Sequence, residues 1–200
     1  AALGLCGCGL HWAGICGGEL TLPWSVPWGH FALAVDHISA LFLIPILLVP
    51  ALGSIYGLAY YPQKKHPATA PRLRLFYGLL AASMGLVVIA RDSLLFLMAW
   101  EIMALSAFFL VTTEDDDLSA CRAGWRYLVA THLGTLCLFA MFLLLARATG
   151  SSSLDPAAAG SVGPATAVAI GVLALAGFGM KAGLMPLHVW LPGAHATAPT

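Results

Sequence analysis

The chain has 200 residues, of which 60% are hydrophobic and only 9% are charged, compared with about 25% charged residues in ordinary soluble domains. Its mean hydropathy is +0.89, and nine acidic residues balance nine basic residues, so that the formal net charge is zero. This composition predicts an all-α, polytopic transmembrane helical bundle that forms a single membrane domain over residues 1–200 and contacts the lipid bilayer. The zero net charge gives no sign of a nucleic-acid partner.

Six hydrophobic stretches approach the length of ~20 residues that a helix needs to cross a bilayer. We expect spans over approximately residues 1–18, 37–61, 75–90, 93–113, 127–146 and 163–184. The first is expected to be the end of a truncated span, because hydrophobic sequence starts at the first residue. The second contains Pro45 and Pro50, which predict a kinked helix whose freed backbone groups are satisfied by neighbouring helices.

The sequence that follows the sixth span predicts a broken helix. A single straight helix over residues 164–198 would be ~50 Å long, which is too long for one crossing. Pro186 and Pro192 also lie in this stretch, and proline inside a helix removes a hydrogen bond and clashes with the preceding turn. We therefore expect a break between Leu184 and Leu187 and a short helix over 188–194. Such a break must face protein or a watery cavity.

The basic residues of the short loops predict the orientation of the chain. Loops 62–74 and 114–126 together contain six lysines and arginines, whereas the loops on the other side contain two. Cytoplasmic loops of membrane proteins carry the excess of basic residues. We therefore expect a multi-pass protein of the cell (inner) membrane with loops 62–74 and 114–126 in the cytoplasm.

Two charged residues are predicted to lie deep in the membrane. Glu101 is the only charged residue in 93–113, and the helical rise places it roughly 13 Å and 20 Å from the nearest charges on either side. Lys181 follows 25 uncharged residues and precedes the predicted break. Ionisable residues inside a membrane usually mark an ion path or a proton relay. The alternatives are a glutamate satisfied by a hydrogen bond between helices and a lysine that extends to the membrane surface.

Glu101 and Lys181 would influence each other's charge most strongly if they lay close together. Opposite charges ~4 Å apart attract by about 4 kcal/mol at an effective dielectric constant near 20. Moving a proton against ~150–200 mV costs about 3.5–4.5 kcal/mol. The attraction is therefore large enough to be coupled to proton movement.

Three histidines are further candidates for a proton path. His132 is the only histidine within the fifth span, which contains no Asp, Glu, Lys or Arg, and His188 and His195 flank the predicted short helix. Imidazole titrates near neutral pH and suits a relay, although a histidine between helices can also be purely structural. No Gly-x-Gly-x-x-Gly, phosphate loop, Cys-x-x-Cys or pair of haem-ligating histidines is present. We therefore expect neither a cofactor nor a metal ion, and interpret the acidic run at 114–117 as a solvated loop.

Two long motifs resemble one known family. DSLLFLMAWEIMALSAFFL at 92–110 resembles the glutamate-bearing helix of the antiporter-like, proton-translocating subunits of respiratory complex I and related hydrogenases. GFGMKAGLMPLHVWLPGAHATAP at 177–199 is similar to the lysine-bearing broken helix of that family. Its histidine-containing part most resembles hydrogenase-4 component B and the matching formate hydrogenlyase subunit, with the Mrp-type antiporters more distant.

The resemblance implies a function and an assembly. Glu101 and Lys181 would be the pair essential for translocation, and His132 falls where complex I subunits often have a polar or charged residue. Members of the family have about fourteen helices in two inverted repeats, so this chain would be a fragment and a partial copy of that fold. It would translocate protons, with Na⁺ as the other candidate ion, beside other membrane-arm subunits and hydrophilic redox subunits, and would hold no redox centre itself. An Mrp-type monovalent cation/proton antiporter subunit and a membrane anchor with vestigial charges are the alternatives.

Overall fold

The computed structural model describes residues 18–26, 29–114, 116–154 and 162–198. The span expected over 1–18 therefore lies outside the described residues, except for Gly18. Five described helices are long and apolar enough to cross a membrane. They are α2 (His37–Tyr60), α3 (Thr69–Ile89), α4 (Ser93–Val111), α5 (Leu118–Thr149) and α6 (Pro164–Ala182). The chain is thus a multi-pass helical membrane protein.

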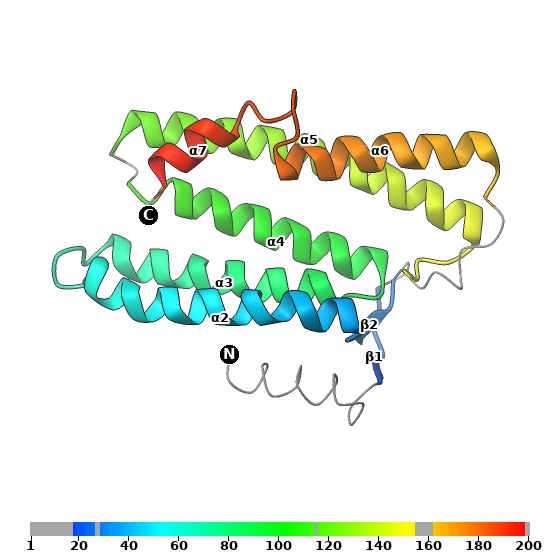
Figure 1. The fold of residues 1–200 in the computed structure, drawn as a ribbon, viewed down its shortest axis with the longest axis horizontal. Helices are drawn as coiled ribbons and strands as arrows, with labels where there is room; N and C mark the ends of the chain where they lie inside the picture. The colour runs from blue at the N-terminus through cyan, green and yellow to red at the C-terminus, as the bar shows by residue number, and fades with distance from the viewer. Residues whose placement is uncertain (1–17, 27–28, 115, 155–161, 199–200) are drawn as a thin grey trace.

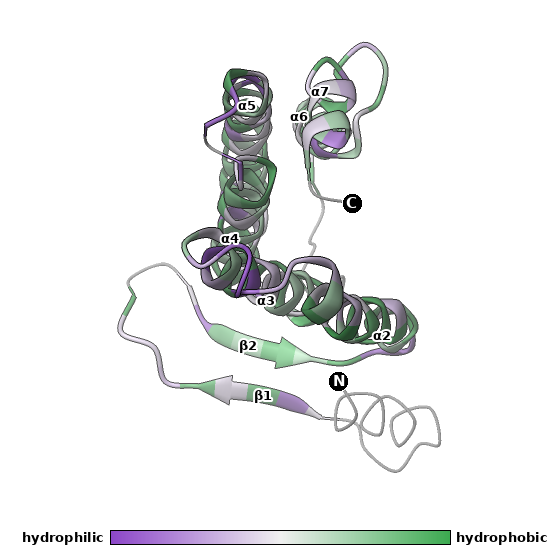
Figure 2. Cartoon of the chain, turned by 90° about the vertical axis from the view of Figure 1, so that its left-hand side faces the viewer, coloured by the Kyte–Doolittle hydropathy of each residue, from purple (hydrophilic) through white to green (hydrophobic). Residues whose placement is uncertain are grey.

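The helices form two groups that meet at α4. Figure 2 shows α2, α3 and α4 in one row, with α5 above α4 and α6 beside α5. A short helix, α7 (Leu191–Thr197), folds back along α5 (Figure 1). Two buried apolar clusters join α4 to α5, one around Trp100 and Leu138 and the other around Tyr127 and Trp190. The second cluster also includes Ala194 of α7, so that the segment after the break packs against the C-terminal end of α4 and the first turns of α5.

A small hairpin is the part of the fold that the all-α prediction did not include. Strands β1 (Glu19–Leu22) and β2 (Phe31–Ala34) pair antiparallel, with Glu19 opposite Ala34. Leu33 of β2 also forms a bridge with Ala90, at the end of α3. The hairpin therefore packs at the end of the bundle where α3 turns into α4 (Figure 1).

Aspartates fix where three of the helices begin. Asp36, Asp92 and Asp117 each accept a hydrogen bond from a backbone N–H in the first turn of α2, α4 and α5. Such caps satisfy donors that have no partner inside the helix. Asp92 is only 1% exposed, and it also accepts a 2.6 Å hydrogen bond from the hydroxyl of Ser152. The turn before α4 is thereby tied to the segment after α5.

The helices extend beyond several of the hydrophobic spans read from the sequence. The span expected over 127–146 lies within α5, and α5 begins earlier, at Leu118, because Asp117 caps it there. For the span over 75–90, the helix is α3, which begins at Thr69. In both cases the extra turns carry arginines. A hydrophobic span marks the part of a helix that suits the membrane interior, whereas the helix itself continues until its hydrogen bonds are capped.

The predicted break is present, and the short helix after it is shifted. Helix α6 ends at Ala182, and Gly183 caps it in the left-handed conformation with φ 70°, a conformation that favours glycine. Instead of 188–194, the short helix α7 covers Leu191–Thr197, with proline in its first turn. Proline fits there because its fixed φ is helical and the first turn needs no N–H donor from it.

The charge of Asp36 gives a pH-dependent prediction. A hydrogen bond from the Ser39 backbone N–H, followed by the Ser39 side chain and Arg91, lowers the pKa of Asp36 from 3.8 to about 2. Asn also caps helices, so Asp36→Asn removes mainly the charge facing Arg91, 2.8 Å away. We expect a melting temperature about 1–3 °C lower at pH 7.

The sign of the pH dependence follows from that lowered pKa. The stabilisation is complete above the ordinary pKa of an aspartate and is lost as the pH falls from about 4 to about 2. The difference between Asp36→Asn and the wild type, measured by thermal unfolding in detergent, should therefore shrink over this range. A difference that stayed constant down to pH 2 would contradict the prediction.

Candidate functional site

Lys181 lies in the last turn of α6, one residue before the helix ends. Its Nζ donates a 2.9 Å hydrogen bond to the hydroxyl of Tyr127 on α5. The same Nζ lies 5.2 Å from the centre of the Tyr127 ring and 5.7 Å from the centre of the Trp100 ring on α4. A cation within about 6 Å of an aromatic face is attracted by the ring. The ammonium is therefore held between α4 and α5 by a hydroxyl and two aromatic rings.

Glu101 contacts a histidine rather than the lysine. Its Oε2 lies 3.4 Å from Nε2 of His132 on α5, whereas its Oε1 is buried and has no hydrogen-bond partner. The described contacts of Glu101 and Lys181 include no ion pair between them, so their charged atoms are more than 4.0 Å apart. Glu101 nevertheless acts electrostatically on both Tyr127 and Lys181. The predicted pair is thus in one neighbourhood without direct contact.

The contact between His132 and Glu101 has a chemical requirement. Nδ1 of His132 lies 2.9 Å from the backbone oxygen of Leu128, and a carbonyl only accepts, so that Nδ1 must carry a proton. In the neutral imidazole, Nε2 is then an acceptor facing another acceptor. A favourable contact with Glu101 requires a proton on Nε2 or on the carboxyl group. The two residues therefore form a pair suited to hold one shared proton.

The other two predicted histidines lie near the break. His195 on α7 lines a cavity of about 930 Å³ together with Lys181, Tyr127 and Trp190. The cavity extends along α2 and α3 and is lined mostly by apolar side chains. His188 lies in the turn between α6 and α7, where its Nδ1 is buried without a hydrogen-bond partner, and it is not among the residues that line this cavity. The structure thus brings His195, but not His188, to the same cavity as Lys181.

Aromatic side chains join the break to α5, and the sequence reading did not identify them. Trp190 donates a 2.8 Å hydrogen bond from Nε1 to the backbone oxygen of Met180, next to Lys181. Its ring meets Tyr127 edge to face, with the ring centres 5.1 Å apart. Trp190 is 7% exposed and Tyr127 is 3% exposed. The sequence did contain a sign of these contacts, because a tyrosine or tryptophan in an apolar helix needs a hydrogen-bond partner for its polar atom.

Two glycines allow α5 and α6 to approach closely. A Cβ added at Gly177 would lie 2.5 Å from a side-chain carbon of Leu138 and 2.9 Å from the backbone oxygen of Gly134. Leu138 is fully buried, so it has little freedom to move. Small residues at crossings of membrane helices permit this kind of close packing. The close contact sets how near Lys181, one turn further along α6, comes to Tyr127.

Gly177→Ala should separate these two helices. We expect it to lower the free energy of unfolding by about 1–3 kcal/mol, since the added methyl group overpacks a closed contact. Gly171→Ala on the same helix is the matched control, because a Cβ there has nothing within 4 Å. Thermal unfolding of both variants in detergent checks the prediction. Equal melting temperatures for the two variants would contradict it.

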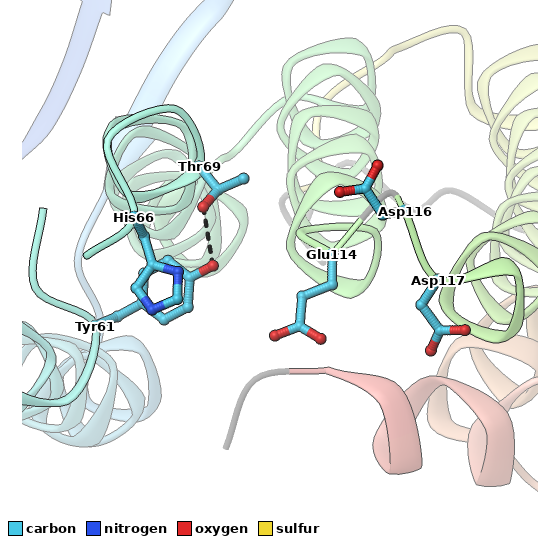
Figure 3. Close-up of a pocket in the computed structure, with 6 residues that line it drawn as sticks. All are labelled: Tyr61, His66, Thr69, Glu114, Asp116 and Asp117. Carbon is cyan, nitrogen blue, oxygen red and sulfur yellow. Dashed lines mark hydrogen bonds between the residues drawn. The ribbon is translucent and has the colours of Figure 1, made fainter.

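A second cavity lies at the end of the bundle that holds the acidic loop. It has a volume of about 460 Å³ and is lined by Tyr61, His66, Thr69, Glu114, Asp116 and Asp117. Figure 3 shows Glu114, Asp116 and Asp117 across the pocket from Tyr61 and His66, with the Glu114 side chain extending towards them and a hydrogen bond between Tyr61 and Thr69. No group of three or more His, Cys, Asp and Glu side chains in the described ranges is arranged to hold a metal ion. The carboxylates here belong to a loop and a helix cap.

A family model matches residues 90–200, which include Glu101, His132 and Lys181. It describes the transmembrane region of NADH:quinone oxidoreductase and Mrp antiporter proteins. The match covers more than half of the chain, and the chain therefore belongs to this family of membrane proteins. This confirms the resemblance read from the two sequence motifs.

Individual relatives show the same relationship. Hydrogenase-4 component B of Escherichia coli K12 is 35% identical over 168 residues, which are 84% of this chain and 25% of that protein. A chain in the structure of the Mrp complex from Dietzia sp. DQ12-45-1b matches 98% of this chain and 22% of its own length, with 26% identity and a TM-score of 0.78.

A chain of respiratory complex I from Thermus thermophilus with bound aureothin matches 99% of this chain and 40% of its own length, with 27% identity and a TM-score of 0.67. Compared with the full length of hydrogenase-4 component B, this chain spans about a quarter.

Proposed function

We propose that this chain is part of a membrane subunit that translocates protons, with Na⁺ as the other candidate ion, in an oxidoreductase complex of the hydrogenase-4/formate hydrogenlyase or complex I type. The observation that carries the proposal is the set of ionisable side chains between apolar helices: His132 beside Glu101, and Lys181 on Tyr127. Ionisable groups are costly at such positions and are retained where ions move. The similarity to hydrogenase-4 component B and to a complex I chain supports the same class.

In the proposed step, the charge on Glu101 controls the charge on Lys181. A proton moving from His132 to the carboxylate of Glu101 removes a negative charge near the ammonium. Two unit charges ~4 Å apart at an effective dielectric constant near 20 attract by about 4 kcal/mol, and by less at larger separations. This is comparable with the roughly 3.5 kcal/mol needed to move a proton against ~150 mV. His195 and His188 would then extend the path beyond the break, His195 through the cavity that it shares with Lys181.

The orientation and partners of the chain are part of the proposal. We place loops 62–74 and 114–126 in the cytoplasm and the protein in the inner membrane, as the distribution of basic residues indicates. Arg72 donates hydrogen bonds to the backbone oxygens of Thr112 and Thr113. This contact supports the proposal that loops 62–74 and 114–126 lie on the same side of the membrane. Redox chemistry would take place in hydrophilic partner subunits, beside other membrane-arm subunits.

An Mrp-type monovalent cation/proton antiporter subunit is the second candidate, favoured by the TM-score of 0.78 to a chain of the Mrp complex. Membrane vesicles that contain the intact protein separate the two functions. Proton uptake driven by an electron donor, together with an iron–sulfur or nickel subunit in the purified complex, supports the first. Proton release on adding Na⁺ without a donor supports the second. Neither response in vesicles that contain the assembled protein would reject both and favour a membrane anchor.

A further inference from the structure

Tyr127 is the only described side chain that forms a hydrogen bond with the amine of Lys181. It is 3% exposed, and its hydroxyl accepts from Nζ at 2.9 Å. An ammonium group has three donors and no acceptor, and away from water it depends on whatever partners the protein offers. Tyr127 supplies both a hydroxyl acceptor and a ring face 5.2 Å from Nζ. The position of the ammonium therefore depends on Tyr127 more than on any other described residue.

The surroundings of Tyr127 fix its ring. Trp190 packs edge to face against it, with the ring centres 5.1 Å apart. Trp190 is held in turn by the hydrogen bond from its Nε1 to the backbone oxygen of Met180. Met180 precedes Lys181 in α6, so these contacts form a closed loop that returns to the lysine. A ring held in this way presents its hydroxyl in one direction.

We propose that Tyr127 is a positioning residue that, together with Trp100, seats the ammonium of Lys181 apart from Glu101. The hydroxyl of Tyr127 accepts from Nζ, and the rings of Tyr127 and Trp100 provide two attractive faces. The inference rests on the proposed function and adds a step to it: Lys181 responds to the charge of Glu101 through space while Tyr127 holds it. Held by Tyr127 and Trp100, the ammonium does not form a direct ion pair with Glu101, so that a change of charge on Glu101 acts on Lys181 through space.

Other groups that face this site determine which measurement is informative. Glu101 acts on the Lys181 amine from α4 and Tyr127 contacts it from α5, whereas His195 from α7 and Arg74 and Tyr77 from α3 line the same cavity. His132 contacts Glu101. A variant that only loosened the packing would lower the amount of assembled complex and leave the pH profile of pumping unchanged. A variant that removed the hydroxyl acceptor of Tyr127 would alter the pH profile of pumping, because it changes the hydrogen-bond partner of Lys181.

Tyr127→Phe in the intact membrane complex tests the inference, since it removes the hydroxyl and keeps the ring. We expect electron transfer close to the wild-type rate, roughly fivefold to tenfold fewer protons pumped per electron, and a displaced pH profile of pumping. Tyr56→Phe is the matched control, because Tyr56 lines the same cavity but is 63% exposed. It should pump like the wild type.

A second variant keeps the inference testable if Tyr127→Phe does not assemble. Trp100→Phe retains a smaller aromatic face, and we expect a reduction in pumping of about twofold to threefold, again with a displaced pH profile. Wild-type pumping in Tyr127→Phe, or lower pumping with an unchanged pH profile, would overturn the role of Tyr127. Normal pumping after Lys181→Ala would instead reject the proposed function itself, so the two failures are distinguishable.

Discussion

Lys181→Ala is expected to reduce proton translocation by about two orders of magnitude, because groups that transfer protons contribute roughly 10²–10⁴-fold to a rate. Lys181 is the only lysine or arginine in α6 and α7, so no neighbour on these helices can replace its charge. Lys181 itself belongs to neither buried apolar cluster, so that removing its side chain leaves Leu138 and Phe142 packed in the core. The variant should therefore fold and assemble.

Inverted membrane vesicles with the intact complex provide the measurement. Acidification of the vesicle interior is recorded with a pH-sensitive dye while electron transfer is followed in the same sample. Lys64→Ala is the matched control, because Lys64 is an exposed lysine in the turn between α2 and α3, and it should pump normally. Pumping by Lys181→Ala at the wild-type rate, with the complex present at the wild-type level, would end the proposal.

Glu101→Gln is expected to have the second largest effect, a loss of roughly thirtyfold to a hundredfold in pumping. Glutamine has the shape of glutamate but cannot take a proton from His132 or carry the negative charge that acts on Lys181. The expected loss corresponds to removing about 2–3 kcal/mol of interaction between separated charges. Electron transfer should continue, because the redox reactions are proposed to occur in other subunits.

The same vesicles test this prediction. Glu114→Gln is the control, since Glu114 is exposed at the acidic cavity shown in Figure 3. Its effect on pumping should be within the error of the measurement. A Glu101→Gln variant that pumped as well as Glu114→Gln would show that the contact between His132 and Glu101 is only structural.

The sequence allowed the broken helix to be predicted because its causes are local. Pro186 and Pro192 disrupt the pattern of helical hydrogen bonds wherever they occur, and Gly183 provides the conformation that ends α6. Glu101 and Lys181 were recognisable for a similar reason, since a charge within a long apolar stretch has few explanations. These features need no knowledge of which helices are neighbours.

The partner of Lys181 was not predictable in this way. Tyr127 is 54 residues away in the chain, and at the sequence level it was only the first residue of an expected span. Its contact depends on the crossing of α5 and α6 at Gly134 and Gly177, which involves the packing of two distant segments. For the same reason, the separation of Glu101 from Lys181 could not be read from the spacing of charges.

The break after α6 also has an electrostatic consequence. The aligned peptide dipoles of a helix place about half a negative charge at its C-terminal end. Because α6 stops at Ala182, part of the way along α5 (Figure 1), this partial charge lies within one turn of the Lys181 amine. A helix that continued to the membrane surface would carry its negative pole into the headgroups. By ending where it does, the backbone itself contributes about 0.3–1 kcal/mol towards keeping a cation at this depth.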